Sequence, residues 1–255
     1  MIKRIILNDR IKVNWNVDIH QALFSKKGNI KLGEIWSFSK LYGETEYYFP
    51  DWNIAIQGTC KGCCKCCEKC CYVRKSYRYS NVIYSHAIHT LAMREKITVL
   101  FTALDEQIKR ANKKPIAIRI NQSGEMETRE EIINWIELSR KYPNIMFFFY
   151  TKRLNILETV LNEYGNENMP KNISILISVW NEYGVKEYNR MKHFDCIKAF
   201  VYDDGYDYKS IGLTPDTTCK AYENGKLNHN ITCEKCGKCF HRRKDFKVIF
   251  CKEHD

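Results

Sequence analysis

Apolar residues in the middle of the chain fall into two alternating patterns. Short, nearly continuous apolar runs of strand length occupy residues 52–57, 116–120, 145–151, 173–179 and 197–202. After the first run come stretches in which apolar residues recur every three or four positions, over residues 81–111, 128–141, 154–164 and 185–193. That spacing predicts helices with one buried face. Strands that are apolar on both faces and alternate with helices indicate a parallel sheet covered on both sides.

Local signals mark several element ends. Thr128 and Glu131 form a capping box at the start of one helix, and Gly165 ends another. The pattern yields about five strands, too few for an eight-stranded barrel of about 250 residues. We therefore predict an α/β fold: a partial (β/α) barrel with mostly parallel strands over residues 1–212. A cysteine-rich C-terminal tail, residues 213–255, is expected to pack on it.

Composition narrows the class of protein. The chain has 255 residues, a formal net charge of +11 and no apolar stretch as long as a membrane span. Its first ten residues lack the apolar core of a signal peptide. We expect a cytoplasmic protein with no membrane partner. The positive charge suits a polyanion such as nucleic acid, although the lysines are spread along the chain rather than clustered.

Thirteen cysteines are the strongest chemical signal. Seven lie within residues 60–71 and four within 219–239, in a long chain without an export signal, so metal binding is favoured over disulfides. The first group follows the predicted strand 52–57, and ligands bind at the carboxyl ends of parallel strands. Dense thiolates suit an iron–sulfur cluster or zinc. Three triplets have suitable spacing: Cys60, Cys64 and Cys67; Cys63, Cys67 and Cys70; and Cys60, Cys67 and Cys71.

The second cysteine group has a regular spacing. Cys233, Cys236 and Cys239 are separated by two residues each, and Cys219 is a candidate fourth ligand from an upstream loop. Four thiolates with no open position suit a structural zinc or a second iron–sulfur cluster, and the sequence leaves both open. Metal binding would help to fold a tail with little core of its own. Cys196 and Cys251 are predicted to be buried as small apolar residues.

Polar residues follow two of the predicted strands. Ser123, Gly124 and Glu125 come after the strand 116–120, and they combine a glycine that lets backbone amides approach a ligand with a carboxylate. The next strand ends in Tyr150-Thr151-Lys152-Arg153, which brings hydroxyl and cationic groups to the same rim of the sheet. Taken alone, each segment is also explained as a solvated turn or a helix entry.

The cysteine loop, the Ser-Gly-Glu turn and their order along the chain resemble radical S-adenosylmethionine enzymes. In those enzymes a three-cysteine loop after the first strand holds a [4Fe-4S] cluster, and a Gly-Gly-Glu-type turn after the second contacts the methionine amino group. The resemblance implies a cluster with one open iron and S-adenosylmethionine bound beside Ser123, Gly124 and Glu125. Ser123 stands where that turn has its first glycine.

Motifs over most of the chain are similar to those of the Gene product 88 family of phage proteins. They are Asn29-Ile-Lys-Leu32 with Ile35-Trp-Ser-Phe38, Thr59-Cys60 with Cys67 and Cys71-Tyr72, Arg119-Ile-Asn-Gln-Ser-Gly-Glu125, Tyr150-Thr-Lys152, and Cys233, Cys236, Cys239 and His254. The resemblance selects Cys60, Cys67 and Cys71 as shared ligands. It leaves Cys63, Cys64, Cys66 and Cys70 as possible extra ligands.

The same resemblance completes the set of candidate site residues. Arg119 joins Tyr150, Thr151 and Lys152 as candidates for cofactor binding, and His254 is a further candidate metal ligand, although a single histidine near a terminus is more often exposed. A phage-encoded protein would act in the host cell cytoplasm. The activity of the family is not implied by these motifs.

Three functions follow as hypotheses. The first is a radical-S-adenosylmethionine-like enzyme that receives electrons from an external donor and acts on an anionic substrate, a nucleotide or nucleic acid. The second is a non-enzymatic, metal-dependent nucleic-acid-binding protein whose affinity falls steeply with salt. The third is an iron–sulfur storage or redox-sensing protein, in which the extra cysteines of residues 60–71 enlarge the cluster.

Overall fold

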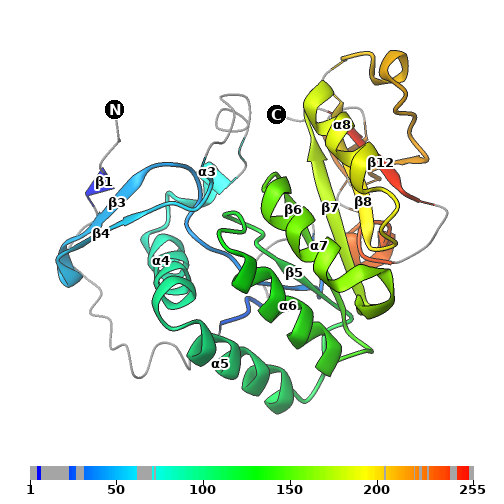
Figure 1. Ribbon diagram of the computed structural model, residues 1–255. Helices are drawn as coiled ribbons and strands as arrows, with labels where there is room; N and C mark the ends of the chain where they lie inside the picture. Colours follow the sequence, from blue (N-terminus) through cyan, green and yellow to red (C-terminus); the bar gives the residue numbers. More distant parts are fainter. Residues whose placement is uncertain are drawn as a thin grey trace. The chain divides into compact units, whose positions relative to one another are not determined.

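The computed structural model divides the chain into two compact units, each treated by itself below (Figure 1). The residues that it describes are 5–6, 23–26, 32–61, 71, 73–203, 205–220, 222–223, 226–228, 230–241 and 246–252. Unit 1 consists of Met1–Ser25, Ser37–Lys113 and Asn121–Glu127. Unit 2 consists of Lys26–Trp36, Lys114–Ile120 and Thr128–Asp255.

Unit 2 is built around a seven-stranded sheet. Its strands, in spatial order, are β2 (Trp36–Ser37), β5 (Ala117–Ile120), β6 (Met146–Thr151), β7 (Ile173–Val179), β8 (Ile197–Asp203), β12 (Val248–Lys252) and β9 (Thr217–Thr218). The pairings from β5 to β9 are all parallel. The predicted α/β fold with a parallel sheet is therefore confirmed. Within the described residues the sheet is open, with β2 and β9 at its edges, and it does not close into a barrel.

Three helices connect the central strands. They are α6 (Arg129–Lys141), α7 (Leu154–Asn168) and α8 (Glu182–Met191). Because β5 to β8 lie side by side in chain order, right-handed crossovers place all three helices on one face, as Figure 1 shows. The predicted cap of α6 is present, since the Thr128 hydroxyl accepts a hydrogen bond from the Glu131 N–H at 3.1 Å. Gly165 interrupts α7 with a φ of 65°.

The opposite face of this sheet is covered by irregular segments rather than helices. Its apolar cluster joins sheet residues to Leu32, Ile35 and Phe240, and Cys233 and Cys239 pack against it. The C-terminal region also carries β9 and β12, a 3-10 helix (Tyr208–Ile211), the antiparallel pair β10 (Tyr222–Glu223) and β11 (Lys226–Leu227), and the one-turn helix α9 (Cys233–Cys236). Two strands of this region are thus part of the sheet. The domain division at residue 212 stays a prediction.

Unit 1 contains a separate, three-stranded sheet and two longer helices. Its elements are β1 (Ile5–Ile6), β3 (Glu46–Phe49), a 3-10 turn (Pro50–Trp52), β4 (Ile54–Gln57), the short helix α3 (Val73–Ser76), α4 (Ser80–Glu95) and α5 (Ile97–Arg110). The core joins Tyr47, Phe49 and Ile56 of the sheet to Ile83 and Tyr84 of α4. Among the described helices of the chain, none has the length and apolar character that a membrane span requires.

Two predictions about this unit are wrong. The strand before the cysteine loop, β4, does not belong to the parallel sheet, because it pairs antiparallel with β3. The single helix predicted over residues 81–111 is two helices, which are separated at Lys96, where φ is −141° and ψ is 43°. Lys96 thus leaves the helical region, and α5 begins at the next residue, Ile97.

Candidate metal centre

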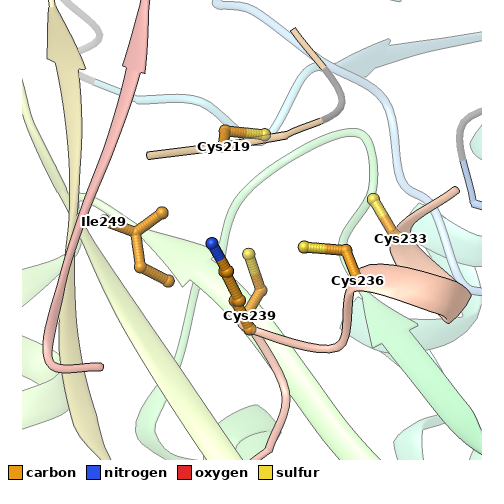
Figure 2. A pocket seen from close by; sticks show the side chains of 6 residues that line it. Cys219, Cys233, Cys236, Cys239 and Ile249 are labelled. Carbon is orange, nitrogen blue, oxygen red and sulfur yellow. The ribbon is translucent and has the colours of Figure 1, made fainter. Parts of the chain in front are cut away.

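Four cysteines of unit 2 line one cavity, and we call them the four-cysteine site: Cys219, Cys233, Cys236 and Cys239. Cys219 follows β9, two of the others begin and end α9, and Cys239 lies in the turn after it. Figure 2 shows their sulfur atoms directed toward the space between them. Cys219 thus lines the same cavity as the three later cysteines, and metal ligation by all four stays a prediction.

The sequence around α9 explains why three of these thiols face one point. The Thr232 hydroxyl caps the turn by accepting from the Lys235 N–H at 3.3 Å, and one helical turn separates Cys233 from Cys236. Gly237 then takes a φ of 68°, which reverses the chain toward Cys239. A Cβ atom at Gly237 would lie 2.5 Å from the His241 ring, so both the conformation and the space require glycine.

Two polar side chains of the central strands hydrogen-bond to the turn after α9 and so attach it to the sheet. The Ser174 hydroxyl of β7 donates to the Cys239 carbonyl at 2.9 Å. The Lys198 ammonium of β8, which is 1% exposed, donates to the Lys238 carbonyl at 2.7 Å and also to the His241 carbonyl. Burial lowers the pKa of Lys198 to about 8. The backbone on either side of Cys239 is thus fixed by the sheet.

Burial and the closeness of the four cysteines disfavour the deprotonated, negatively charged form of the Cys239 thiol. The pKa of Cys239 is raised to about 12, first by burial and then by the neighbouring Cys233, Cys219 and Cys236, whereas a hydrogen bond from the Tyr150 hydroxyl opposes the shift. The pKa of Tyr150 is itself raised well above its ordinary value, first by burial and then by Cys239. A bound cation would reverse this balance, because it stabilises thiolates and releases their protons.

The chemistry of the four side chains is that of a metal centre, whereas their present spacing is not. Four cysteine thiols are the donor set of structural zinc sites and of iron–sulfur clusters. The cavity volume is about 20 Å³, on a scale where roughly 10–15 Å³ holds one water molecule. Within the described part of the chain, no three His, Cys, Asp or Glu side chains already stand in an arrangement that could hold a metal, so the thiols would have to close around it.

The first cysteine group is represented by its two ends. Cys60 and Cys71 are described and partly buried, whereas Cys63, Cys64, Cys66, Cys67 and Cys70 lie outside the described residues. Burial raises the pKa of Tyr47, and both described thiols add to this shift, so the two ends of the loop act on the same hydroxyl. Burial also raises the pKa of Tyr77, with a smaller contribution from Cys60.

The Ser-Gly-Glu turn lies directly against the base of this loop, within unit 1. The Thr59 hydroxyl, 1% exposed, accepts from the Glu125 N–H at 2.8 Å and donates to the Leu41 carbonyl at 2.8 Å. The Ser123 hydroxyl donates to the Lys40 carbonyl at 2.9 Å. Gly124 has a φ of 82°, and a Cβ there would lie 2.6 Å from the Thr59 hydroxyl oxygen. The Ser-Gly-Glu turn is therefore in contact with Thr59, the residue before Cys60.

The remaining predicted cofactor-binding residues belong to unit 2. The Arg119 guanidinium lies 4.8 Å from the Tyr150 ring centre, and the Lys152 ammonium lies 4.4 Å from the Trp180 ring centre. The Thr151 hydroxyl accepts from the Arg153 N–H at 2.9 Å and so supports the entry to α7. The Glu125 carboxylate, in unit 1, accepts from the Met126 N–H at 2.8 Å. His254 lies outside the described residues, and Cys196 and Cys251 are buried as predicted.

The sequence interpretation did not select Lys198 and Trp180. Both lie on the face of the sheet that carries the four-cysteine site. Lys198 is a charged residue inside an otherwise apolar run, which is a signal of a buried partner. Trp180 directly follows a strand at the edge where parallel sheets bind ligands, and it stacks on Tyr202 with ring centres 4.1 Å apart. Both signals were present in the sequence.

Comparison with protein families gives one match, to the family described as Gene product 88, over residues 23–242. The curated proteins and the solved structures each contain no match. The matched range covers most of the chain and includes the Ser-Gly-Glu turn and both cysteine groups. Its extent shows that the chain belongs to the Gene product 88 family.

Proposed function

We propose that this protein is a radical-S-adenosylmethionine-like iron–sulfur enzyme, with Cys60, Cys67 and Cys71 as ligands of a [4Fe-4S] cluster. One observation carries the proposal: the 2.8 Å hydrogen bond from the Glu125 N–H to the Thr59 hydroxyl. It joins the two segments that would have to act on one cofactor, although they are far apart in the sequence. The open iron of such a cluster would supply the electron that cleaves S-adenosylmethionine.

The surrounding residues have roles that do not depend on the identity of the substrate. The Tyr47 hydroxyl donates to the Tyr42 carbonyl at 3.1 Å, and the Tyr77 hydroxyl is hydrogen-bonded to His86 Nδ1 at 2.9 Å, so both tyrosines help to fix the segments beside Cys60 and Cys71. Beside the turn, the fully buried Lys40 ammonium is 3.8 Å from the Glu127 carboxylate, and Arg94 binds the same carboxylate at 2.7 Å. These contacts brace the turn that would receive the methionine end of the cofactor.

The four-cysteine site is proposed to have a structural role. With four thiolates and no open position, a zinc ion there would bind no substrate, and its binding energy would stabilise the turn after α9. Four cysteine thiols also suit a second iron–sulfur cluster, which would have the same structural role. We propose that this metal secures one face of the sheet in unit 2.

A second candidate function is a non-enzymatic nucleic-acid-binding protein with two structural metal sites. The closed donor set of the four-cysteine site and the net charge of +11 favour it. In this case binding would weaken steeply with added salt, because each phosphate contact releases counterions. The enzyme is preferred because a purely structural loop would not need the Ser-Gly-Glu turn at its base.

S-Adenosylmethionine cleavage by anaerobically reconstituted protein tests the enzyme proposal. With dithionite as electron donor, we expect 5′-deoxyadenosine, measured by liquid chromatography and mass spectrometry. Thr59→Val keeps the shape of the side chain and removes both hydrogen bonds of its hydroxyl, so it should reduce cleavage about tenfold or more at unchanged iron content. Thr102→Val, at an exposed hydroxyl that donates to the Thr98 carbonyl at 2.8 Å, is the matched control.

Two results would contradict the proposal. One is reconstituted protein that yields no cleavage product and no change in its electron paramagnetic resonance spectrum when S-adenosylmethionine is added. The other is equal loss of activity in both threonine variants, since that would make the Thr59 contact irrelevant. Iron analysis of the same samples also tests the storage hypothesis, because an enlarged cluster would give clearly more iron than two ordinary clusters.

A further inference from the structure

The carboxyl ends of β6, β7 and β8 carry a row of cationic and aromatic side chains. The Lys152 ammonium lies 4.4 Å from the centre of the Trp180 ring. Trp180 stacks on Tyr202 with ring centres 4.1 Å apart and planes inclined by 19°. All three are partly exposed. We call these residues the aromatic row.

The strand register places the aromatic row on the same face as the four-cysteine site. Thr151 pairs with Ile177 and Val179 with Val201, so the residues next to them, Lys152, Trp180 and Tyr202, share one face. Tyr150 and Phe200 lie on this face two residues earlier, and they belong to the apolar cluster that Cys233 and Cys239 contact. The row therefore stands at the ligand-binding edge of the sheet, on the face that holds the four-cysteine site.

We propose that the aromatic row is a binding site for a nucleobase that carries a phosphate, with Trp180 as stacking platform and Lys152 as phosphate ligand. The proposal deepens the proposed function, on which it rests for the enzyme's substrate class. A base would replace the lysine over the indole ring. The released ammonium would then reach the phosphate that follows the base.

The magnitudes favour this exchange. An exposed cation over an aromatic ring contributes about 2- to 5-fold to an equilibrium. Stacking of a base on an aromatic side chain contributes about 5- to 150-fold to affinity. The base therefore gains more from the Trp180 face than the lysine loses, and the lysine gains a phosphate in return. The second ring, Tyr202, keeps the indole in place from its other side.

A second cation–aromatic pair lies behind the row and extends its positive charge. The Arg119 guanidinium is 4.8 Å from the Tyr150 ring centre, and Tyr150 meets Phe200 edge to face at 4.9 Å. Tyr150 also hydrogen-bonds Cys239 of the four-cysteine site. A phosphate held at Lys152 would thus lie on a face that carries a second fixed positive charge, which favours anionic nucleotides over neutral nucleosides.

Binding of fluorescein-labelled octathymidylate to the full chain, followed by fluorescence anisotropy, tests the site. Thymine is used because it cannot be confused with the adenine of S-adenosylmethionine. We expect Trp180→Ala to weaken binding by about 5- to 150-fold and Trp180→Phe to weaken it less than about 5-fold. Lys152→Gln should reduce the slope of log affinity against log salt by about 0.7. Tyr79→Ala is the control, since Tyr79 is 51% exposed under the Arg78 guanidinium and no second ring of the described residues stacks on it.

Competition identifies the source of the base. Thymidine 5′-monophosphate should displace the oligonucleotide through Trp180 if the site takes a single nucleotide, and only longer oligonucleotides should do so if it takes a single strand. Both results support a base-and-phosphate site. Equal displacement by inorganic phosphate at the same ionic strength would overturn it, because the base would then be unnecessary.

Two further results would overturn the proposal. One is unchanged binding by a correctly folded Trp180→Ala variant, and the other is an equal loss in the Tyr79→Ala control. The assay contains neither S-adenosylmethionine nor reductant. Trp180-dependent binding without cleavage activity would therefore remove only the proposed reaction, whereas cleavage without Trp180-dependent binding would remove only this site.

Discussion

Replacing Lys198 by methionine tests whether the sheet positions the four-cysteine site. Lys198 is 1% exposed, and its ammonium donates to the carbonyls of Lys238 and His241, which flank Cys239. Methionine has a similar length and fills the same space without a donor. The variant therefore removes the two hydrogen bonds and keeps most of the packing.

The expected cost is the difference between two large terms. Hydrogen bonds from a charged donor contribute about 1.5–3 kcal/mol each. Against them stands the burial of the charge: the fall in the pKa of Lys198 from 10.5 to about 8 corresponds to roughly 3 kcal/mol. We expect a net destabilisation of up to about 3 kcal/mol, concentrated in the turn after α9. If metal binds only the ordered turn, its affinity should fall by about tenfold.

Cobalt(II) is a suitable probe, because thiolate coordination gives it strong visible absorption. We expect Lys198→Met to raise the cobalt dissociation constant about tenfold in a chelator competition. Lys247→Met is the matched control, since the Lys247 ammonium also donates to two backbone carbonyls, those of Asp195 at 2.9 Å and Ile197 at 3.2 Å, rather than to the carbonyls that flank Cys239. The reasoning is refuted if both variants bind cobalt like the unaltered protein, or if both lose affinity equally.

Three further changes test the packing of each unit. Gly124→Ala combines a φ of 82° with a Cβ 2.6 Å from the Thr59 hydroxyl oxygen, so the free energy of unfolding in urea should fall by about 2–4 kcal/mol. Gly212→Ala, at a φ of 80° with no atom within 4 Å of the added Cβ, is the control and should lower it by only about 1 kcal/mol. Burial lowers the pKa of His89 from 6.5 to about 4. The unfolded chain therefore binds the proton more readily than the folded protein does. The contribution of His89 to the free energy of unfolding is complete above pH 6.5 and falls by up to roughly 3 kcal/mol as the pH drops to 4. His89→Gln should flatten that pH dependence, and an unchanged slope would contradict the assignment. Asn172→Ala removes an amide that donates to three carbonyls and should lower the melting temperature by several degrees, as measured by circular dichroism.

The sequence predicts the parallel part of the fold well because its signals are local. The strand 173–179 has the bounds of the structure, since its apolar run has no competing pattern. The Thr128 cap depends on a few neighbouring residues, and so does the grouping of Cys233, Cys236 and Cys239, where one helical turn and one glycine place the thiols. Each of these features needs no partner far along the chain.

The errors arise where a distant partner decides the outcome. Residues 54–57 form a short strand in either arrangement, and only the alternating segment 46–49 and the tight connection between them indicate a hairpin. The apolar run 248–252 was assigned to the tail, yet it inserts between β8 and β9. A four- or five-residue run carries too little pattern to choose its neighbours. The choice is made by burial against strands more than forty residues away.

The polar atoms inside the sheet argue that the four-cysteine site belongs to the core of unit 2. A serine and a lysine in the centre of β7 and β8 would ordinarily weaken an apolar face, because each must find a hydrogen-bond partner away from water. Ser174 and Lys198 find their partners in the backbone around Cys239. These hydrogen bonds explain why polar residues occupy these two positions in the strands. Removing the turn would leave two buried donors without acceptors. The sheet and the turn therefore depend on each other, and a metal that orders the turn should raise the stability of the sheet as well.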